Sequence, residues 1–334
     1  MKSASPRFLH VANGGSTTAT IAAAGIPGTL SIWADSLYDG PVPGGVSDDE
    51  LLLVRAEFHS GPEHTTSEVA TGLAKWRSVI ADGDYDELVL WYEHDLFDQL
   101  NLIHLLSWGR GHMPAGKQIS LVCIGSFPGR PNFKGLGELT PQELAPLLDT
   151  RQPVTAAQYE VAERAWEAYR SPTPDAMVRL LQTDTSPLPF LAKAIGRFLE
   201  EYPWTTDGLS KFERRLLELV ADDPMTLLSA FPRMQENESA YYLTDSSLVD
   251  LASALSTASP PLATIGGSTP SGSSSSGPHQ LLQQTFTLTD AGREVLSGGQ
   301  DRVGLCGIDK WLGGVHLTDG GTIWRWSPER GRIV

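Results

Sequence analysis

Four acidic or ionisable side chains follow an unbroken apolar run in the first half of the chain. The run is Leu88–Tyr92, and Glu93, His94, Asp95 and Asp98 come after it. A short run of this kind predicts a buried parallel strand. Ligands of open α/β sheets bind at the carboxyl ends of such strands. The sequence therefore predicts a site here, with His94 as the general acid–base because its ordinary pKa is near neutrality.

The same side chains have a structural interpretation. Apolar residues recur at helical spacing after Asp95, so Asp95 is a candidate N-cap and Asp98 a first-turn acid beside the positive end of the helix dipole. Gln99 fits the same first turn. Capping and ligand binding both stay open for this group.

A glycine turn follows the first predicted strand, Phe8–Ala12. Asn13–Ser16 leads into a Thr/Ala-rich helix that Gly25 can end. A strand, a glycine turn and a helix direct free N–H groups toward an anion, here those of Gly14, Gly15 and Ser16. The chain lacks the full dinucleotide-binding and Walker patterns, so a simple tight turn is the alternative.

A second strand, Thr29–Ala34, ends at Asp35, and a stiff loop containing Asp39 follows it. Ser47 then begins a capping box in front of a helix that carries Arg55. If the two strands are neighbours, Asp35 and the Asn13 turn open onto one rim. Arg55 is either a clamp for a carboxylate or phosphate or an ordinary surface arginine.

The remaining patterns of the first half complete an α/β domain. Helices are expected at 67–81 and after Asp95, and Ile119–Ile124 is expected to be the last parallel strand. This order predicts a three-layer α/β domain over residues 1–135, with a mostly parallel sheet of at least four strands.

The second half is expected to hold a helical bridge at 136–186 and an α+β domain at 187–334. Helices are predicted at 188–201, 209–221, 224–235 and 246–256, and paired strands at 261–264 and 284–288 flank a flexible Gly/Ser insert at 266–279. These elements and the Leu-Thr-x-x-Gly start of a last helix at 288–296 resemble a winged-helix domain. The tail segments 309–316 and 322–326 are expected to form a β-hairpin.

Composition restricts the partners. The chain of 334 residues has 25 Lys and Arg against 40 Asp and Glu, a net charge of −15. Such a surface repels DNA and anionic membranes unless a basic patch exists. Residues 187–334 are also acidic, with 12 basic against 17 acidic residues. We therefore expect a protein partner for the winged-helix-like region more than DNA. Two cysteines and no apolar signal segment favour the cytoplasm and no membrane association.

Four separated blocks of the first domain form a recognisable set: HVANG at 10–14, WADSLYDGPVP at 33–43, RA at 55–56 and LWYEHDLFDQL at 90–100. Together they resemble a bacterial family known as domain of unknown function 1835. The resemblance covers about the first 130 residues. It supports the fold and the place of the polar cluster, and it implies no reaction. The matching polar or loop positions are Asn13, Asp35, Asp39, Gly40, Pro41, Arg55, Glu93, His94, Asp95, Asp98 and Gln99.

The leading hypothesis is an α/β domain that holds a small anionic or nucleotide-like ligand at the strand ends. An enzyme of this kind would be a hydrolase or transferase acting on a phosphorylated substrate, with a divalent cation as its candidate cofactor. Its candidate catalytic residues are His94, Asp95 and Asp35. The candidate ligand-binding residues are Asn13, Gly14, Gly15, Ser16, Asp39, Arg55, Glu93, Asp98 and Gln99. A ligand-sensing regulator and a scaffold without chemistry are the alternatives.

Overall fold

The computed structural model describes residues 6–266 and 278–334. The chain divides into two compact units. The first extends to Ile195 and includes Gly313–Val315, and the second comprises Gly196–Leu312 and His316–Val334. The region expected to bridge two domains, 136–186, thus lies within the first unit.

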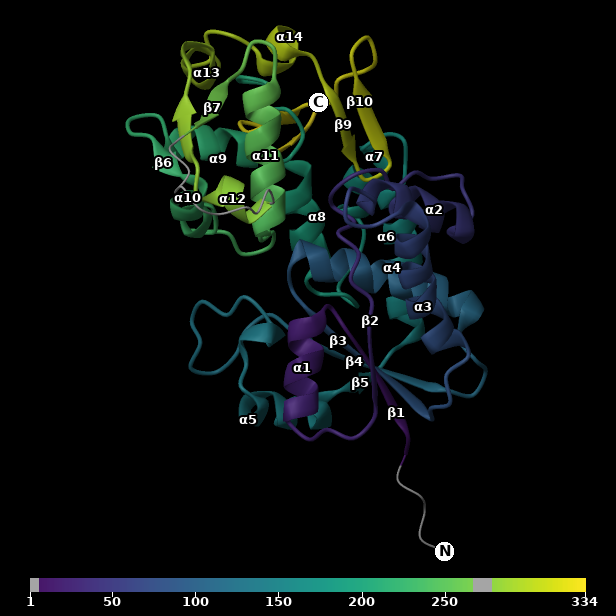
Figure 1. Cartoon of the computed structure of the whole chain (residues 1–334). Coiled ribbons are helices and arrows are strands. Elements are labelled where there is room, and N and C mark those ends of the chain that lie inside the picture. Colours follow the sequence, from purple (N-terminus) through teal and green to yellow (C-terminus); the bar gives the residue numbers. More distant parts are fainter. Residues whose placement is uncertain (1–5, 267–277) are drawn as a thin grey trace, which may run out of the picture. The chain divides into compact units, whose positions relative to one another are not determined.

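A five-stranded, mostly parallel sheet is the centre of the first unit (Figure 1). Its strands, in chain order, are β1 (Phe8–Ala12), β2 (Thr29–Ile32), β3 (Glu87–Glu93), β4 (Gln118–Ile124) and β5 (Gln152–Pro153). Their order across the sheet is β2-β1-β3-β4-β5. The first four strands are parallel, which confirms the expected mostly parallel sheet.

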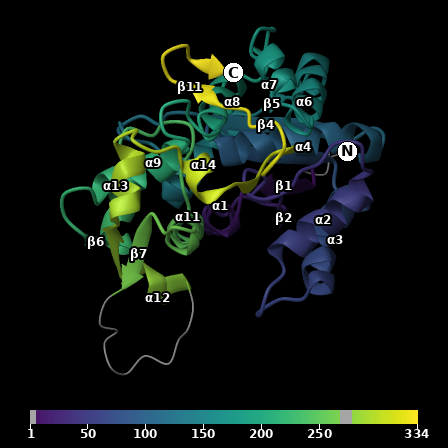
Figure 2. The ribbon, with the colours of Figure 1, turned by 90° about the horizontal axis from the view of Figure 1, so that it is seen from above.

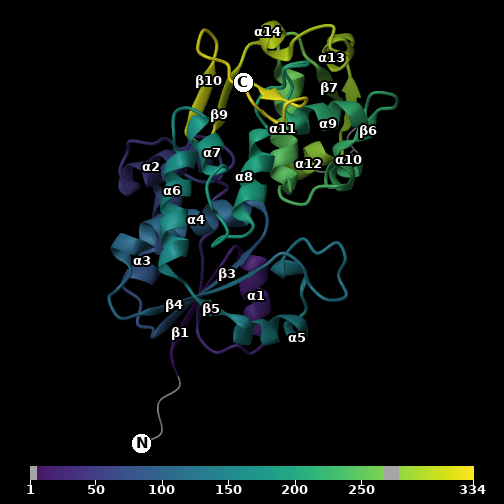
Figure 3. The same ribbon diagram turned by 180° about the vertical axis from the view of Figure 1, so that it is seen from behind.

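The last strand, β5, runs antiparallel to β4, and the two lie next to each other in Figure 3. It has only two residues, so it carries too little periodicity to be read from the sequence. One of them is Pro153, which is tolerated because β5 is an edge strand.

The parallel register brings several strand ends to one edge of the sheet. Ala12, the last residue of β1, pairs with Ile32 at the end of β2 and with Trp91 near the end of β3. The residues that follow these three strands therefore share the carboxyl edge, as the sequence predicted for the Asn13 turn, Asp35 and the Glu93–Asp95 group.

Helices flank this sheet. In the first unit they are α1 (Gly15–Ala23), α2 (Asp48–His59), α3 (Thr66–Ala81), α4 (Leu96–His112), α5 (Pro141–Leu144), α6 (Ala156–Tyr169) and α7 (Asp175–Leu180), with the 3-10 turns η1 (Leu136–Glu138) and η2 (Ala145–Thr150). Figure 2 shows α1 on one side of the strands and α4 and α6 on the other. The α2 and α3 helices lie side by side.

The apolar run in β3 is buried along its whole length. Val89 and Trp91 pack with Ile21 of α1 and with Leu136 and Leu144 of the following segment. Leu88, Leu90 and Tyr92, which point to the opposite face, are also fully buried, so both faces of β3 are covered and its sequence is continuously apolar instead of alternating. The predicted burial of α4 on several sides is also confirmed, since twelve of its residues are buried.

The second unit contains helices and small antiparallel sheets. Its helices are α9 (Lys211–Leu219), α10 (Leu227–Met234), α11 (Asp245–Thr257), α12 (Pro278–Leu282), α13 (Asp290–Leu296) and α14 (Arg302–Cys306), and α8 (Leu191–Leu199) spans the boundary between the units. The strands β6 (Met225–Thr226), β8 (Thr285–Leu288) and β7 (Ala263–Gly266) form one sheet in that order. The expected helices and strand pair are present, and most of the predicted Gly/Ser insert lies outside the described residues.

The tail differs from its prediction as a single hairpin. Two short sheets form instead, one from β9 (Asp309–Leu312) and β10 (Val315–Thr318), the other from β11 (Trp326–Ser327) and β12 (Arg332–Ile333). The turn at Gly313 and Gly314 lies inside the first predicted segment and folds it back on itself, with Gly313 at a φ of 62° that favours glycine. Among the described residues, none of the helices combines the length and apolar character of a membrane span.

Candidate functional site

Three carboxyl groups meet where β3 passes into α4. Glu93 ends the strand, Asp95 is the N-cap of the helix and Asp98 lies in its first turn. One oxygen from each lies within 4.8 Å of the others. All three side chains are buried, and we call this group the carboxylate cluster.

The cluster also performs the capping role that the sequence suggested. Asp95 Oδ1 accepts a hydrogen bond from the Asp98 N–H at 2.9 Å, and Asp98 Oδ1 accepts one from the Glu93 N–H at 2.9 Å. Gln99 Nε2 donates to the Glu93 carbonyl at 2.6 Å. These bonds fix the turn between strand and helix, so capping and clustering are two properties of one arrangement.

Asn13 joins the first strand to the cluster. Its Nδ2 donates to Asp98 Oδ2 at 3.0 Å, while its Oδ1 accepts a bond from Thr17 Oγ1 at 2.8 Å. The α1 helix begins at Gly15, and its N-cap, Gly14, has no side chain to bond the first-turn N–H groups. The predicted anion-binding turn, with Ser16 in the first turn of α1, therefore lies next to a residue of the cluster.

The Glu93 side chain contacts η1, a segment far from it in the sequence. Its Oε1 accepts a hydrogen bond from the Leu136 N–H at the start of η1. A Cβ placed on Gly135 would overlap the Glu93 carboxylate, so any larger residue there would require this carboxylate to move. No pattern in the sequence links residues 43 positions apart, and this contact could not have been predicted.

Burial makes the charged form of all three carboxyl groups unfavourable. Burial, with the nearby Asp95 charge, raises the pKa of Glu93 to about 8. It also raises the pKa of Asp95 to about 6. The pKa of Asp98 lies well above its ordinary value because of burial and the two neighbouring carboxyl groups. Within residues 6–266 and 278–334, no Lys, Arg or His side chain forms an ion pair with any of them.

His94 follows Glu93 but packs among aromatic rings. Its ring lies 6.3 Å from that of Phe133 and 6.1 Å from that of Phe190. Burial, with the charge of Lys193, lowers the pKa of His94. Asp35, the other candidate catalytic acid, has both of its oxygens bonded to side chains of α2, Arg55 and His59.

Asp35 is the centre of a separate network, to which Arg55 and His59 of α2 contribute. Arg55 Nη2 and Nε donate to its two oxygens at 2.7 and 2.9 Å. His59 Nε2 lies 2.7 Å from Asp35 Oδ1. The backbone of Asp35 is held by Asn101 of α4, which accepts from its N–H at 2.9 Å and donates to its carbonyl at 2.8 Å.

Arg55 is buried and so is not an ordinary surface arginine; its guanidinium ties the loop after β2 to α2. Besides Asp35, its guanidinium donates to the carbonyls of Ser36, Asp39 and Pro41 at 3.0, 2.7 and 3.3 Å. All of its N–H groups thus have acceptors within the chain. Asp39, predicted to bind ligand, contributes its backbone carbonyl to this tie.

The two sets of acids at this edge differ in charge. Burial alone would raise the pKa of Asp35, but the Arg55 charge and the bonds from His59 and Arg55 hold it well below its ordinary value. Asp35 is therefore ionised at neutral pH, whereas the carboxylate cluster resists ionisation. His59 is a member of this network that was not predicted, although it stands four residues after Arg55 and hence on the same face of α2.

These acidic residues lie at the carboxyl edge of the parallel sheet, the edge at which open α/β sheets bind their ligands. The sequence matches no model of a known protein family and no curated protein. The site must therefore be interpreted from its own geometry.

Replacing Arg55 tests its structural role. We expect Arg55→Leu to lower the unfolding free energy by about 3–5 kcal/mol, because the buried Asp35 charge would lose its guanidinium partner and keep only the side-chain bond from His59. Chemical denaturation measures this loss. Arg110→Leu is the matched control, since Arg110 pairs with Glu163 at the surface and should cost less than about 1 kcal/mol. Equal losses in the two variants would contradict the structural role.

Proposed function

We propose that the first unit binds a divalent cation in the carboxylate cluster and, beside it, a small phosphate-bearing ligand. The observation that carries this proposal is the meeting of Glu93, Asp95 and Asp98 without a basic partner among the described residues. The class of activity it supports is a hydrolase or transferase acting on a phosphorylated substrate.

The chemistry of the cluster favours a hard cation. Removing charged carboxylates from water is costly unless they are paired, protonated or bound to a metal. Oxygen ligands of this kind are preferred by Mg²⁺, Mn²⁺ and Ca²⁺. A bound Mg²⁺ would let all three groups ionise at neutral pH and would polarise a phosphoryl oxygen.

The neighbouring end of α1 supports a negatively charged ligand. The uncapped first turn begins at Gly15, and the Cα of Gly14 and Gly15 face open space. A pocket of about 450 Å³ borders this turn and is lined by Gly15, Thr18, Lys75 and Trp76 among others. Helix N–H groups and a lysine are suitable partners for phosphate.

Cation binding is tested by titrating the full chain with Mg²⁺ and Mn²⁺ in a calorimeter. We expect one site, and a loss of affinity of at least about tenfold in Asp98→Asn, which removes one charge while keeping its shape. Glu63→Gln is the control, because Glu63 is exposed and outside the cluster. Unchanged affinity in Asp98→Asn, or no binding by the unmodified chain, would contradict the proposal.

The cluster also predicts how stability varies with pH. Folding raises the pKa of Glu93 from 4.5 to about 8, so the folded state holds more protons than the unfolded state between these values. The metal-free protein should accordingly lose stability as the pH rises through this interval. Stabilisation by Mg²⁺ should grow over the same interval, because the cation binds ionised carboxylates. Thermal unfolding with chelator and with Mg²⁺ measures both trends, and a Mg²⁺ effect that weakens with rising pH would contradict them.

The second unit favours a second candidate function, a ligand-sensing regulator. It contains the set of secondary-structure elements expected of a winged-helix domain: the helices α9, α10, α11 and α13 and the three-stranded sheet β6-β8-β7. The α9 helix carries three basic residues, Lys211, Arg214 and Arg215, and each pairs with an acid: Lys211 with Glu200, Arg214 with Asp207 and Glu218, and Arg215 with Glu236. This charge pairing supports a protein partner more than a phosphate backbone.

Gel-shift experiments distinguish these partners. We expect the full chain to leave duplex DNA unshifted even at low salt, because its net charge is −15 and the basic residues of α9 are paired. Binding that falls steeply with added salt would overturn this expectation and favour a DNA-binding regulator.

A further inference from the structure

A second pocket lies at the carboxyl end of β2, beside the Asp35 network. Its volume is about 440 Å³, within the range of small-molecule sites. We propose that this pocket binds a small planar compound that carries an N–H or O–H donor and no negative charge, and that Asp35 and His59 form its proton-accepting pair. The proposal is independent of the cation in the carboxylate cluster.

The hydrogen bonds of Asp35 determine which nitrogen of His59 carries a proton. Asp35 is ionised and can only accept, so His59 Nε2, at 2.7 Å, must be the donor. Arg55 Nη2 lies 3.0 Å from the same nitrogen, but its two hydrogens have acceptors in Asp35 and Ser36. In neutral His59 the lone pair therefore belongs to Nδ1.

The free lone pair makes His59 a base for a ligand in the pocket. No hydrogen bond to Nδ1 of His59 is present among the described residues, and the side chain is 28% exposed while it lines the pocket. When Nδ1 takes a proton from a ligand O–H or N–H, the ligand keeps the electron pair and the imidazole becomes a cation. Asp35 stays ionised and stabilises that cation, and reversal returns the proton.

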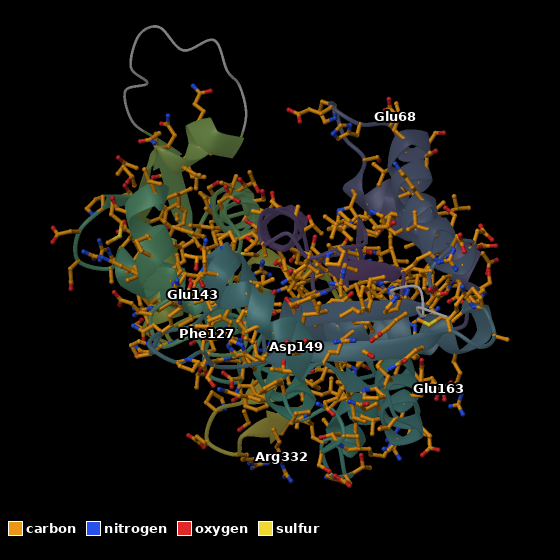
Figure 4. The ribbon with its side chains drawn as sticks, turned by 90° about the horizontal axis from the view of Figure 1, so that it is seen from below. Glu68, Phe127, Glu143, Asp149, Glu163 and Arg332 are labelled. Carbon is orange, nitrogen blue, oxygen red and sulfur yellow. The ribbon has the colours of Figure 1, made fainter. Side chains whose placement is uncertain are left out.

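The remaining lining selects the class of ligand. Val69, Leu73 and Trp76 of α3 supply an apolar wall, and Trp76 offers a ring face for stacking. Glu68, near the amino-terminal end of α3 in Figure 4, adds a negative charge. The lining contains Asp35 and Glu68 but no Lys or Arg, and His59 and His64 are its only side chains that can become cationic, so a ligand without negative charge matches it better than a phosphate or carboxylate.

A smaller cavity adds hydrogen-bonding capacity beside this pocket. Its volume is about 20 Å³, enough for one water-sized group, and it shares Asp35, Leu73 and Trp76 with the larger pocket. His104 lines it, and both ring nitrogens of this buried side chain lack a hydrogen-bond partner within residues 6–266 and 278–334. A polar substituent or a water at this position would satisfy them.

The proton position is tested by long-range ¹H–¹⁵N spectra of the histidine rings in the full chain. We expect neutral His59 to be protonated at Nε2. Protonation at Nδ1 would overturn the proposal, because the pocket would then meet a donor instead of a base.

Ligand selection is tested with three probes that share one ring: nicotinamide, 1-methylnicotinamide and nicotinate. The first two carry an amide donor and are neutral or cationic, whereas nicotinate is anionic and only accepts. We expect the two amides to bind in the presence of chelator and to shift the His59 and Trp76 signals, with nicotinate at least about tenfold weaker. Failure of both amides to bind, or equal binding of nicotinate, would overturn the proposal.

Variants assign that binding to the pocket. His59→Phe keeps a ring but removes the base, and Trp76→Leu removes the stacking face without touching Asp35. Each should weaken nicotinamide binding at least about tenfold, and His112→Gln, an exposed histidine outside the pocket, should leave it unchanged. A melting curve confirms folding of each variant. Folded Trp76→Leu with unchanged affinity would contradict the proposal.

Discussion

Three carboxyl groups buried at one strand end, without a basic side chain to pair with them in the described chain, are the constraint on which this structure depends. Glu93, Asp95 and Asp98 cannot all be ionised there unless a cation joins them. Their positions follow from the apolar run of β3, which is buried on both faces and leads directly into α4. The fold thus holds a high-energy group of acids in place with ordinary secondary structure.

Asp35, at the same edge of the sheet, is a buried acid whose charge is neutralised within the chain. Asp35 is also buried, but Arg55 donates hydrogen bonds to both of its oxygens. Arg55 also donates to three carbonyl groups of the loop that follows β2. The cost of burial is offset within the chain, so Asp35 stays ionised. The carboxylate cluster and the Asp35 network therefore differ in chemistry along one sheet edge. We propose a cation for the carboxylate cluster, and for the Asp35 network a neutral or positively charged ligand that donates a hydrogen bond.

The sequence predicted the parts of this arrangement that depend on local patterns. The continuous apolar run predicted β3, and the capping residues predicted the starts of α2 and α4. The parallel order of the strands predicted that Asn13, Asp35 and Glu93 share an edge of the sheet. The direction in which each side chain points could not be predicted from the sequence. Whether Arg55 binds ligand or Asp35 depends on the path of a loop, and Glu93 meets the distant Leu136 amide through tertiary packing alone. His59 could have been predicted as a member of the network, because its i, i+4 spacing from Arg55 places both residues on one face of the helix.

Crystals soaked in Mn²⁺ and measured near the manganese absorption edge test the central claim most directly. The account predicts an anomalous peak bonded to oxygens of Glu93, Asp95 and Asp98. Manganese absent from the cluster, under conditions in which the carboxyl groups ionise, would contradict it.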